Sequence, residues 1–185
     1  MDSQLEGYLL QLTSITQDLP GVAGRLSSVQ FNWQPRPGRW SIGQCVAHLN
    51  ITLERYLPVL DQAIAVGRSQ GRLAEGPFAA SLFERWFISV LEPPVRLRFK
   101  APKPFVAGVD LEVGPTLAQW DELHRRFTEC IRSTEGLHRG HIKVRSQFGP
   151  ISFSLGSTFG VLLAHERRHV WQAREVRKDV GFPAG

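Results

Sequence analysis

Residues 155–178 read LGSTFGVLLAHERRHVWQAREVRK, and this stretch indicates the fold class. Its apolar residues recur at the three- and four-residue spacing that marks one face of an α-helix. The inward positions are Leu155, Phe159, Leu162, Leu163, Val170 and Ala173. Gly181 and Pro183 follow, where helix stop signals are common. The pattern predicts a long amphipathic helix from about Leu155 to Lys178.

Three further stretches have the same helical spacing. The first covers about residues 3–18, and Pro20 either ends that helix or kinks it before two further turns. The second begins at Ser41, because SIGQ at 41–44 has the Ser-x-x-Gln form of a capping box, and it ends at Gly67. The third follows Gly114-Pro115 and carries a buried stripe that ends at Ile131.

The connections between these helices are predicted to be mostly irregular. FNWQPRPGRW at 31–40 contains two prolines and a glycine, which excludes a helix and predicts a turn-rich connector. Residues 80–91 predict one short amphipathic helix, residues 95–110 a crossover loop, and residues 134–152 a second glycine-containing connector. The expected fold is therefore all-α, a four-helix bundle with a long crossover connection, in a single domain over residues 1–185.

Composition narrows the functional classes. The 185 residues carry a net charge of +5, but the basic residues are scattered and no basic stripe with interleaved aromatics predicts nucleic-acid binding. No signal peptide begins the sequence, and no apolar run reaches the ~18 residues of a membrane span. Cys45 and Cys130 are far apart with no metal or redox spacing. We therefore expect reduced thiols in a cytoplasmic protein that binds neither nucleic acid nor membrane.

The histidines carry the clearest chemical signal. His165 and His169 are four residues apart, which places them about 40° apart on one side of a helix and one turn along it. Both rings can therefore reach the same ion. His48, at the edge of the apolar stripe of the second helix, is the natural third ligand. Spacing alone is equally compatible with solvated histidines on a basic surface, and this alternative stays open here.

His165-Glu166-x-x-His169 also matches the zincin protease signature, in which the glutamate is the general base. A third zincin ligand is missing, because only 16 residues follow His169. Gln172 and Glu175 stand where the extended zincin motif needs glycine and histidine. No strand is predicted upstream to hold a peptide. A protease is therefore the weaker interpretation.

Several polar residues have two interpretations. Glu166 falls in the middle of the apolar stripe, where a carboxylate needs a partner, so it either pairs with an arginine or orients a ligand. Gln172, one turn past His169, is either a second layer around the metal or a surface residue. His124 is expected to be exposed, and the connector at 138–141, including its arginine, is expected to be solvated.

Five runs of residues together resemble the DinB-like superfamily, the DinB/YfiT-type four-helix proteins. They are FNW at 31–33, PGRWSI at 37–42, HL at 48–49, FGP at 148–150 and HERRHVWQ at 165–172. The resemblance spans nearly the whole chain. It implies that His48, His165 and His169 bind a divalent metal ion, with zinc and nickel the leading candidates, and that the chain forms a homodimer.

The resemblance implies a metal-dependent thiol S-transferase or hydrolase acting on a small molecule, with a low-molecular-weight thiol as one cosubstrate. Three neutral imidazoles leave a coordination position open, as in catalytic zinc sites. There the ion would lower the pKa of a water or of a thiol. The alternative is a non-catalytic metal or small-molecule binding protein of the same fold, and a metal-free interaction module is a third reading. No catalytic side chain is assigned.

Overall fold

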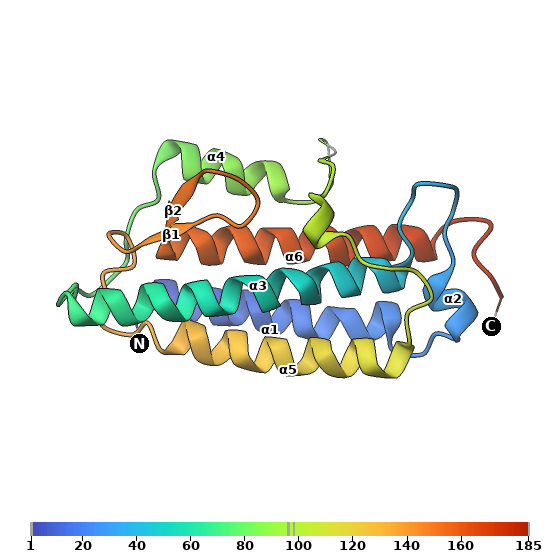
Figure 1. The fold of residues 1–185 in the computed structure, drawn as a ribbon, viewed down its shortest axis with the longest axis horizontal. Helices are drawn as coiled ribbons and strands as arrows, with labels where there is room; N and C mark the ends of the chain where they lie inside the picture. The colour runs from blue at the N-terminus through green and yellow to red at the C-terminus, as the bar shows by residue number, and fades with distance from the viewer. Residues whose placement is uncertain (1, 96, 98, 185) are drawn as a thin grey trace.

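Four long helices lie side by side in the computed structural model, which describes residues 2–95, 97 and 99–184 (Figure 1). They are α1 (Ser3–Ala23), α3 (Ile42–Ser69), α5 (Val113–Arg132) and α6 (Leu155–Arg177). The shorter elements are α2 (Ser28–Asn32), α4 (Leu82–Leu91), the 3-10 turn η1 (Lys103–Phe105), and the strands β1 (Lys143–Arg145) and β2 (Ser152–Ser154). The prediction of an all-α four-helix bundle is confirmed.

The long crossover is a consequence of the helix directions. α3 and α5 run in the same direction (Figure 1), so the chain between them must return along the length of the bundle. Residues 70–112 make this return through α4 and η1. Positions 96 and 98 of the predicted loop at 95–110 lie outside the described residues. Within the described residues, no helix is both long and apolar enough to cross a lipid bilayer.

The apolar stripes of the four long helices form one core cluster. It includes Leu12 and Leu19 of α1, Leu53 and Tyr56 of α3, Trp120 and Phe127 of α5, and Phe159 and Leu163 of α6. Burying each large apolar side chain stabilises the fold by roughly 1.5–3 kcal/mol. α3 contacts both α5 and α6 extensively. This packing fixes α3 against α6, the two helices that carry the predicted ligands.

Capping boxes set the starts of three helices. Ser41 accepts a hydrogen bond from the Gln44 N–H, and Gln44 accepts one from the Ser41 N–H, so the predicted start of α3 is confirmed. Ser27 and Gln30 make the same reciprocal pair at α2. The prediction that no helix forms over 31–40 is therefore wrong at Phe31 and Asn32. The capping box starts this short helix before the prolines end it.

Two helices continue past a predicted stop signal. α1 continues past Pro20 to Ala23, which is the second of the two predicted outcomes, because Val22 and Ala23 are buried in the core and offset the hydrogen bond that proline removes. α3 continues past Gly67 to Ser69. Gly67 lies inside the helix, where a side chain would collide with Ile142, so this glycine serves close packing and not termination.

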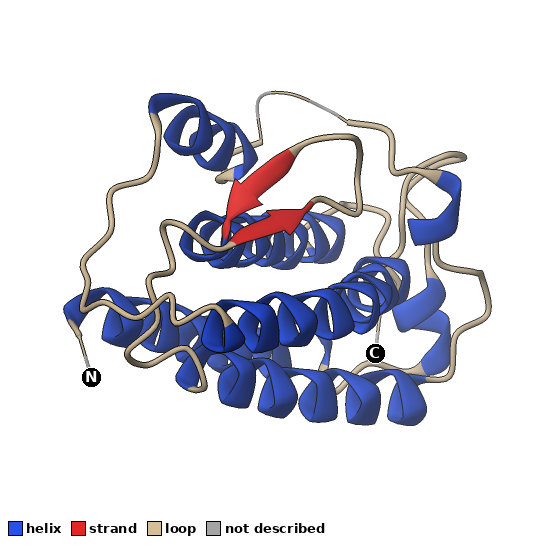
Figure 2. Ribbon diagram, turned by 60° about the vertical axis from the view of Figure 1, so that its left-hand side comes forward, coloured by secondary structure: helices blue, strands red, loops and turns tan. Residues whose placement is uncertain are grey.

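The predicted connector at 134–152 contains a small sheet. β1 and β2 are antiparallel, with Val144 opposite Phe153, and both of these side chains are buried. The strands lie against α6 and lead directly into it, beneath α4 (Figure 2). Three residues are too few for a period-2 pattern to be recognised in the sequence.

Glu84 ties α4 to the start of α6. One carboxylate oxygen accepts the Ser81 N–H at 2.8 Å and the other accepts the Ser154 N–H at 2.7 Å. Burial alone would raise the pKa of Glu84, but these hydrogen bonds lower it to about 2. The carboxylate is therefore charged over the physiological range, and it holds α4 over one side of α6.

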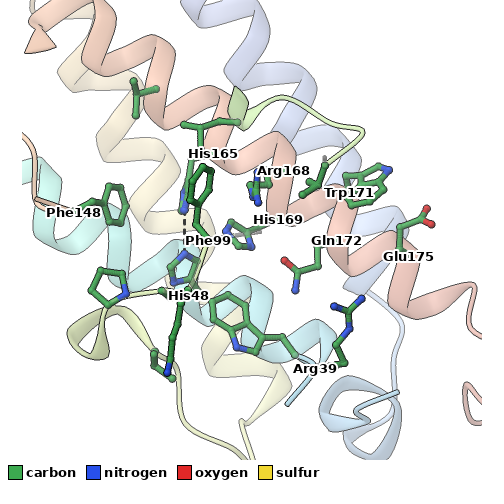
Figure 3. A pocket seen from close by; sticks show the side chains of 18 of the residues that line it. Arg39, His48, Phe99, Phe148, His165, Arg168, His169, Trp171, Gln172 and Glu175 are labelled. Carbon is green, nitrogen blue, oxygen red and sulfur yellow. Dashed lines mark hydrogen bonds between the residues drawn. The ribbon is translucent and has the colours of Figure 1, made fainter. Parts of the chain in front are cut away.

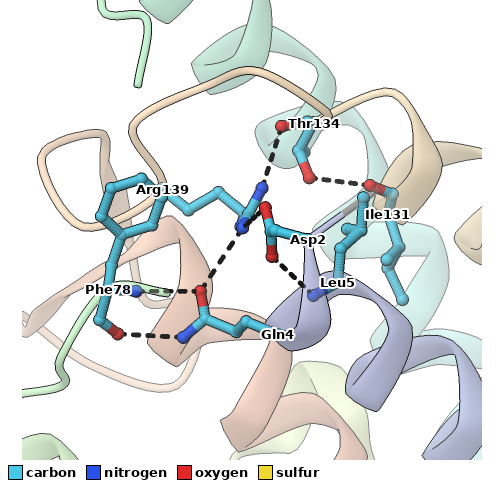
Figure 4. A network of polar contacts seen from close by, with 7 residues as sticks. All are labelled: Asp2, Gln4, Leu5, Phe78, Ile131, Thr134 and Arg139. Atoms are coloured by element: carbon cyan, nitrogen blue, oxygen red, sulfur yellow. Dashed lines mark hydrogen bonds and ion pairs between the residues drawn. The ribbon is translucent and has the colours of Figure 1, made fainter. Parts of the chain in front are cut away.

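Arg139 closes one end of the bundle (Figure 4). Its guanidinium is fully buried, pairs with Asp2 at 2.5 Å and donates to the Thr134 carbonyl at 3.1 Å. Asp2 in turn accepts the Leu5 N–H and caps α1. The expectation that this connector is solvated is wrong at Arg139, because Asp2, 137 residues away in the chain, supplies a partner for the buried guanidinium.

Candidate metal centre

Three buried histidines converge between α3 and α6. His48, His165 and His169 are 2%, 7% and 8% exposed, and one ring nitrogen from each lies within 4.8 Å of the others. Figure 3 shows the three rings facing one shared point. The pair on α6 meets there because of its four-residue spacing, and His48 meets them because α3 packs against α6. Their convergence is as predicted; their role as ligands stays a prediction.

The ring of His48 has a fixed orientation. Its Nδ1 lies 2.7 Å from the Phe105 carbonyl of η1, and because a carbonyl only accepts, Nδ1 must carry the proton. In the neutral ring, Nε2 therefore presents a lone pair. That Nε2 lies 3.1 Å from Nε2 of His165. A backbone carbonyl on the second nitrogen is the common support for a metal-binding histidine.

The spacing and charge of the cluster fit a divalent ion. Two imidazole nitrogens on a tetrahedral zinc ion lie about 3.3 Å apart, close to the observed separation of His48 and His165. Burial lowers the pKa of His48, and it lowers the pKa values of His165 and His169 well below their ordinary value. All three rings are therefore neutral, as metal ligation requires. Nδ1 of His165 and of His169 are buried without hydrogen-bond partners among the described residues.

No fourth protein ligand joins the three histidines within the described part of the chain. Cys45, one turn before His48, is 1% exposed and belongs to the hydrophobic core. Burial raises the pKa of its thiol, so it does not offer a thiolate. An ion held by the cluster would have open coordination positions, which is typical of a catalytic site.

A cavity of about 1020 Å³ opens in front of the cluster. One part of its wall is apolar and includes Phe87, Leu91, Phe148, Ile151, Phe153 and Val161. Trp40 lies in the wall too, and its ring stacks on His169 with centroids 5.5 Å apart. Gln172 also lines the cavity, and its hydrogen bond raises the pKa of His169, although burial outweighs this. A supporting role for Gln172 around the metal stays a prediction.

Glu166 and His124 form a separate buried pair. Their side chains are 2% and 3% exposed, and His124 Nε2 lies 2.7 Å from Glu166 Oε2. The expectation that His124 is exposed is wrong, and the partner of Glu166 is a histidine of α5 and not an arginine. The sequence feature that could have predicted this pair is the glutamate in the middle of an apolar stripe, because a buried carboxylate requires a partner on a facing helix.

The two acceptors around the His124 ring favour its doubly protonated form. Its Nδ1 donates to the Trp120 carbonyl at 2.8 Å, and its Nε2 faces a carboxylate. Burial disfavours the charged ring, but the attraction and hydrogen bond of Glu166 outweigh it and raise the pKa of His124. The pair is therefore a buried ion pair, not an extension of the three-histidine cluster.

Two features of the site have no counterpart in the sequence prediction. The Phe105 carbonyl that orients His48 is a backbone group and leaves no signature in residue types. Arg168 lines the cavity directly beside His169. It stands inside the HERRH motif, but helical spacing alone gave no reason to place it in the cavity.

Comparison with known proteins places this geometry in a family. No curated protein matches the chain significantly. A solved structure with the same fold is that of YfiT from Bacillus subtilis, described as a probable metal-dependent hydrolase with an unusual four-helix bundle topology. The two share 16% identity over 99% of this chain and 91% of YfiT, with a TM-score of 0.64. The profile of the DinB superfamily matches residues 11–173. The chain belongs to the DinB superfamily.

Proposed function

We propose that His48, His165 and His169 bind one divalent metal ion and that the chain is a metal-dependent enzyme acting on a small molecule. The observation that carries this proposal is the convergence of three neutral imidazoles at a large cavity, with no fourth ligand among the described residues. When bound, such an ion supplies Lewis-acid chemistry, lowering the pKa of a water or thiol and polarising an electrophile. The reaction would be thiol S-transfer or hydrolysis.

The chain's own residues prepare the site for this chemistry. The Phe105 carbonyl holds the proton of His48 on Nδ1, which leaves Nε2 free to ligate. Trp40 packs on both His48 and His169, with ring centroids 4.8 and 5.5 Å away, and restricts their rotation. The apolar wall beside the cluster limits water, so charges inside the cavity are poorly screened and interact strongly.

Other parts of the proposal rest on family likeness. The description of YfiT as a probable metal-dependent hydrolase supports hydrolysis, and the resemblance noted above supports zinc or nickel and a thiol cosubstrate. A homodimer is part of the proposal, supported by the exposed apolar residues Leu82, Phe83 and Trp86 of α4. A cytoplasmic location is supported by two free, buried cysteines.

The test is turnover by the metal-loaded protein. Zinc- and nickel-loaded samples would be assayed with 4-nitrophenyl acetate and an anilide for hydrolysis, and with an electrophile plus bacillithiol, mycothiol or glutathione for thiol transfer. We expect at least one reaction to require the metal and to be lost in His169→Ala but kept in His141→Ala, whose side chain is exposed. Absence of turnover from every substrate, with the metal still bound, would favour the non-catalytic binding protein.

A further inference from the structure

Arg168 is a buried cation in the wall of the cavity. It is 7% exposed, lies on α6 next to His169 and faces the cavity between the histidines and Phe99 (Figure 3). Its guanidinium lies over the Phe99 ring, with Cζ 5.5 Å from the ring centroid. Any charged group recruited to this cavity must interact with Arg168.

Arg168 lacks a carboxylate partner among the described residues. Its neighbour Arg167 has one, pairing with Glu92 through two hydrogen bonds of 2.5 and 2.9 Å. Arg168 instead donates to two backbone carbonyls, those of Val90 and Leu97. A buried charge is costly unless it is paired, and a guanidinium has five N–H donors. The described residues thus give the Arg168 guanidinium two carbonyls and the face of the Phe99 ring, 5.5 Å from Cζ to the centroid, but no carboxylate, and leave it with spare donors.

The surroundings of Arg168 define what could compensate it. The three histidines beside it are neutral, so a divalent ion bound there would add positive charge that no protein ligand offsets. Lys100, Arg36 and Arg39 also line the cavity. Its two carboxylates are Glu175, which pairs with Lys178 at 2.8 Å, and Asp179, and both come two or more turns after Arg168 along the chain. Arg168 is therefore the cation next to the histidine cluster, beside an apolar wall, and the two carboxylates of the cavity come later in the chain.

We propose that Arg168 binds an anionic group, a carboxylate or phosphate, on a substrate whose apolar body lies against Phe148 and Phe153. The proposal rests on the proposed function, because it places the reacting part of that substrate at the three histidines. A planar guanidinium matches a carboxylate or a phosphate through two parallel hydrogen bonds. The anion also supplies the negative partner that the described residues do not give to Arg168.

The test compares ligands that differ only in charge. Binding of 4-phenylbutyrate, 3-phenylpropyl phosphate and neutral 4-phenylbutyramide to the zinc-loaded protein would be measured by calorimetry. We expect one or both anions to bind roughly tenfold or more tightly than the amide, because hydrogen bonds between two charged groups are stronger than those to a neutral amide. The stronger anion identifies the class. Equal affinity for all three ligands would overturn the proposal.

Variants assign the preference to Arg168. Arg168→Gln should reduce the preference for the anion to about twofold or less, and Arg168→Lys should keep part of it, because the charge remains but the planar fork is lost. Arg174→Gln removes the same charge from an exposed position of α6 that pairs with Asp18, and should leave the preference unchanged. A preference unchanged in Arg168→Gln would overturn the proposal. Arg168 would then have only the structural role of donating hydrogen bonds to the Val90 and Leu97 carbonyls. If Arg168→Gln does not fold, an unchanged preference in Arg168→Lys overturns the proposal.

Removal of the metal separates this proposal from the proposed function. Metal content, measured by elemental analysis, reports on the histidine cluster alone. After chelation, a preference carried by Arg168 should persist, although weaker, because its guanidinium stays in place. A preference that disappears on chelation would show that the ion and not Arg168 holds the anion. Protein that takes up no zinc or nickel when either is supplied, yet still selects the anion, would contradict the proposed function but leave the role of Arg168 intact.

Discussion

A cluster of three buried histidines and a buried pair of one histidine with one glutamate lie on either side of α6. These two groups have opposite electrostatic character. His165 joins His48 and His169 at the cavity, whereas the adjacent Glu166 points away and pairs with His124 at 2.7 Å. Consecutive helical residues project about 100° apart, so one turn of α6 serves both groups. The first group has no carboxylate among the described residues, while the second has one in direct contact with the ring.

The difference shows that burial alone does not set the state of a histidine. His48 and His124 are almost equally buried, at 2% and 3% exposure. Burial lowers the pKa of His48, whereas Glu166 reverses this effect at His124 and raises its pKa. Neutral rings with converging lone pairs are suited to a metal, and a charged ring against a carboxylate is suited to holding helices together. The partner distinguishes a ligand from a structural residue.

The largest predicted effect concerns metal content. His169→Ala and His165→Ala should fall from about one zinc or nickel ion per chain to a small fraction after dialysis, because two imidazoles do not complete a tight site. His124→Ala should retain the ion, since its ring is committed to Glu166. Elemental analysis of the purified variants measures this. Loss of metal in His124→Ala with His169→Ala unaffected would reverse the roles of the two groups.

The next effect concerns stability. Glu166→Gln leaves the buried charge of His124 without its carboxylate and should lower the free energy of unfolding by about 3–5 kcal/mol. Urea unfolding of the metal-free protein measures the change. His141→Gln, at an exposed ring, is the control and should change stability by less than about 0.5 kcal/mol.

A double variant sharpens the second prediction. Removing both charges in His124→Phe with Glu166→Leu should cost less than the sum of the single changes, because each single change leaves one buried charge unpaired and the double change leaves none. Strict additivity of the two single changes would show that His124 and Glu166 do not interact as an ion pair.

The sequence predicted most of the helices but few of the contacts between them. Apolar periodicity identified all four long helices, and the Ser-x-x-Gln pattern placed the start of α3 correctly. The same pattern at Ser27 was overlooked, because the downstream prolines suggested a connector. Periodicity is local, since it follows from the geometry of one helix at a time. Features within one helix were therefore predictable.

Features that depend on two distant elements could not be predicted from the sequence. Helical spacing placed His124 beside the apolar stripe of its own helix. In the structure it is buried against Glu166, 42 residues later in the chain. The orientation of His48 depends on a backbone carbonyl 57 residues away. The histidine cluster was accessible to prediction because two members share one helix turn, His48 lies at the edge of the apolar stripe of its helix, and the family resemblance supported all three. Its charge environment, including Arg168, required the packed structure.

The smallest predicted effect is the pH dependence of the His124 contribution. The pKa of His124 is raised in the fold, so its stabilising effect is fully present below the unfolded value of about 6.5 and is lost as the pH rises through the higher folded value. For the metal-free cluster the sign is opposite. The pKa values of His165 and His169 are lowered, so their neutral rings favour the fold above about pH 6.5 and oppose it as the pH falls.

Unfolding of the metal-free wild type and of His124→Gln between pH 5.5 and 9 separates these contributions. The stability difference between the two proteins should be largest at the acidic end and should shrink towards pH 9, because only the charged ring gains from the Glu166 carboxylate. In His165→Gln the reverse is expected: the wild type should lose stability relative to the variant as the pH falls, because one fewer buried ring has to stay neutral in the variant. A His124 difference that stays constant across this range would mean that the ring is neutral in the fold. Both groups would then be alike in charge, and only the convergence of lone pairs would distinguish the cluster from the pair.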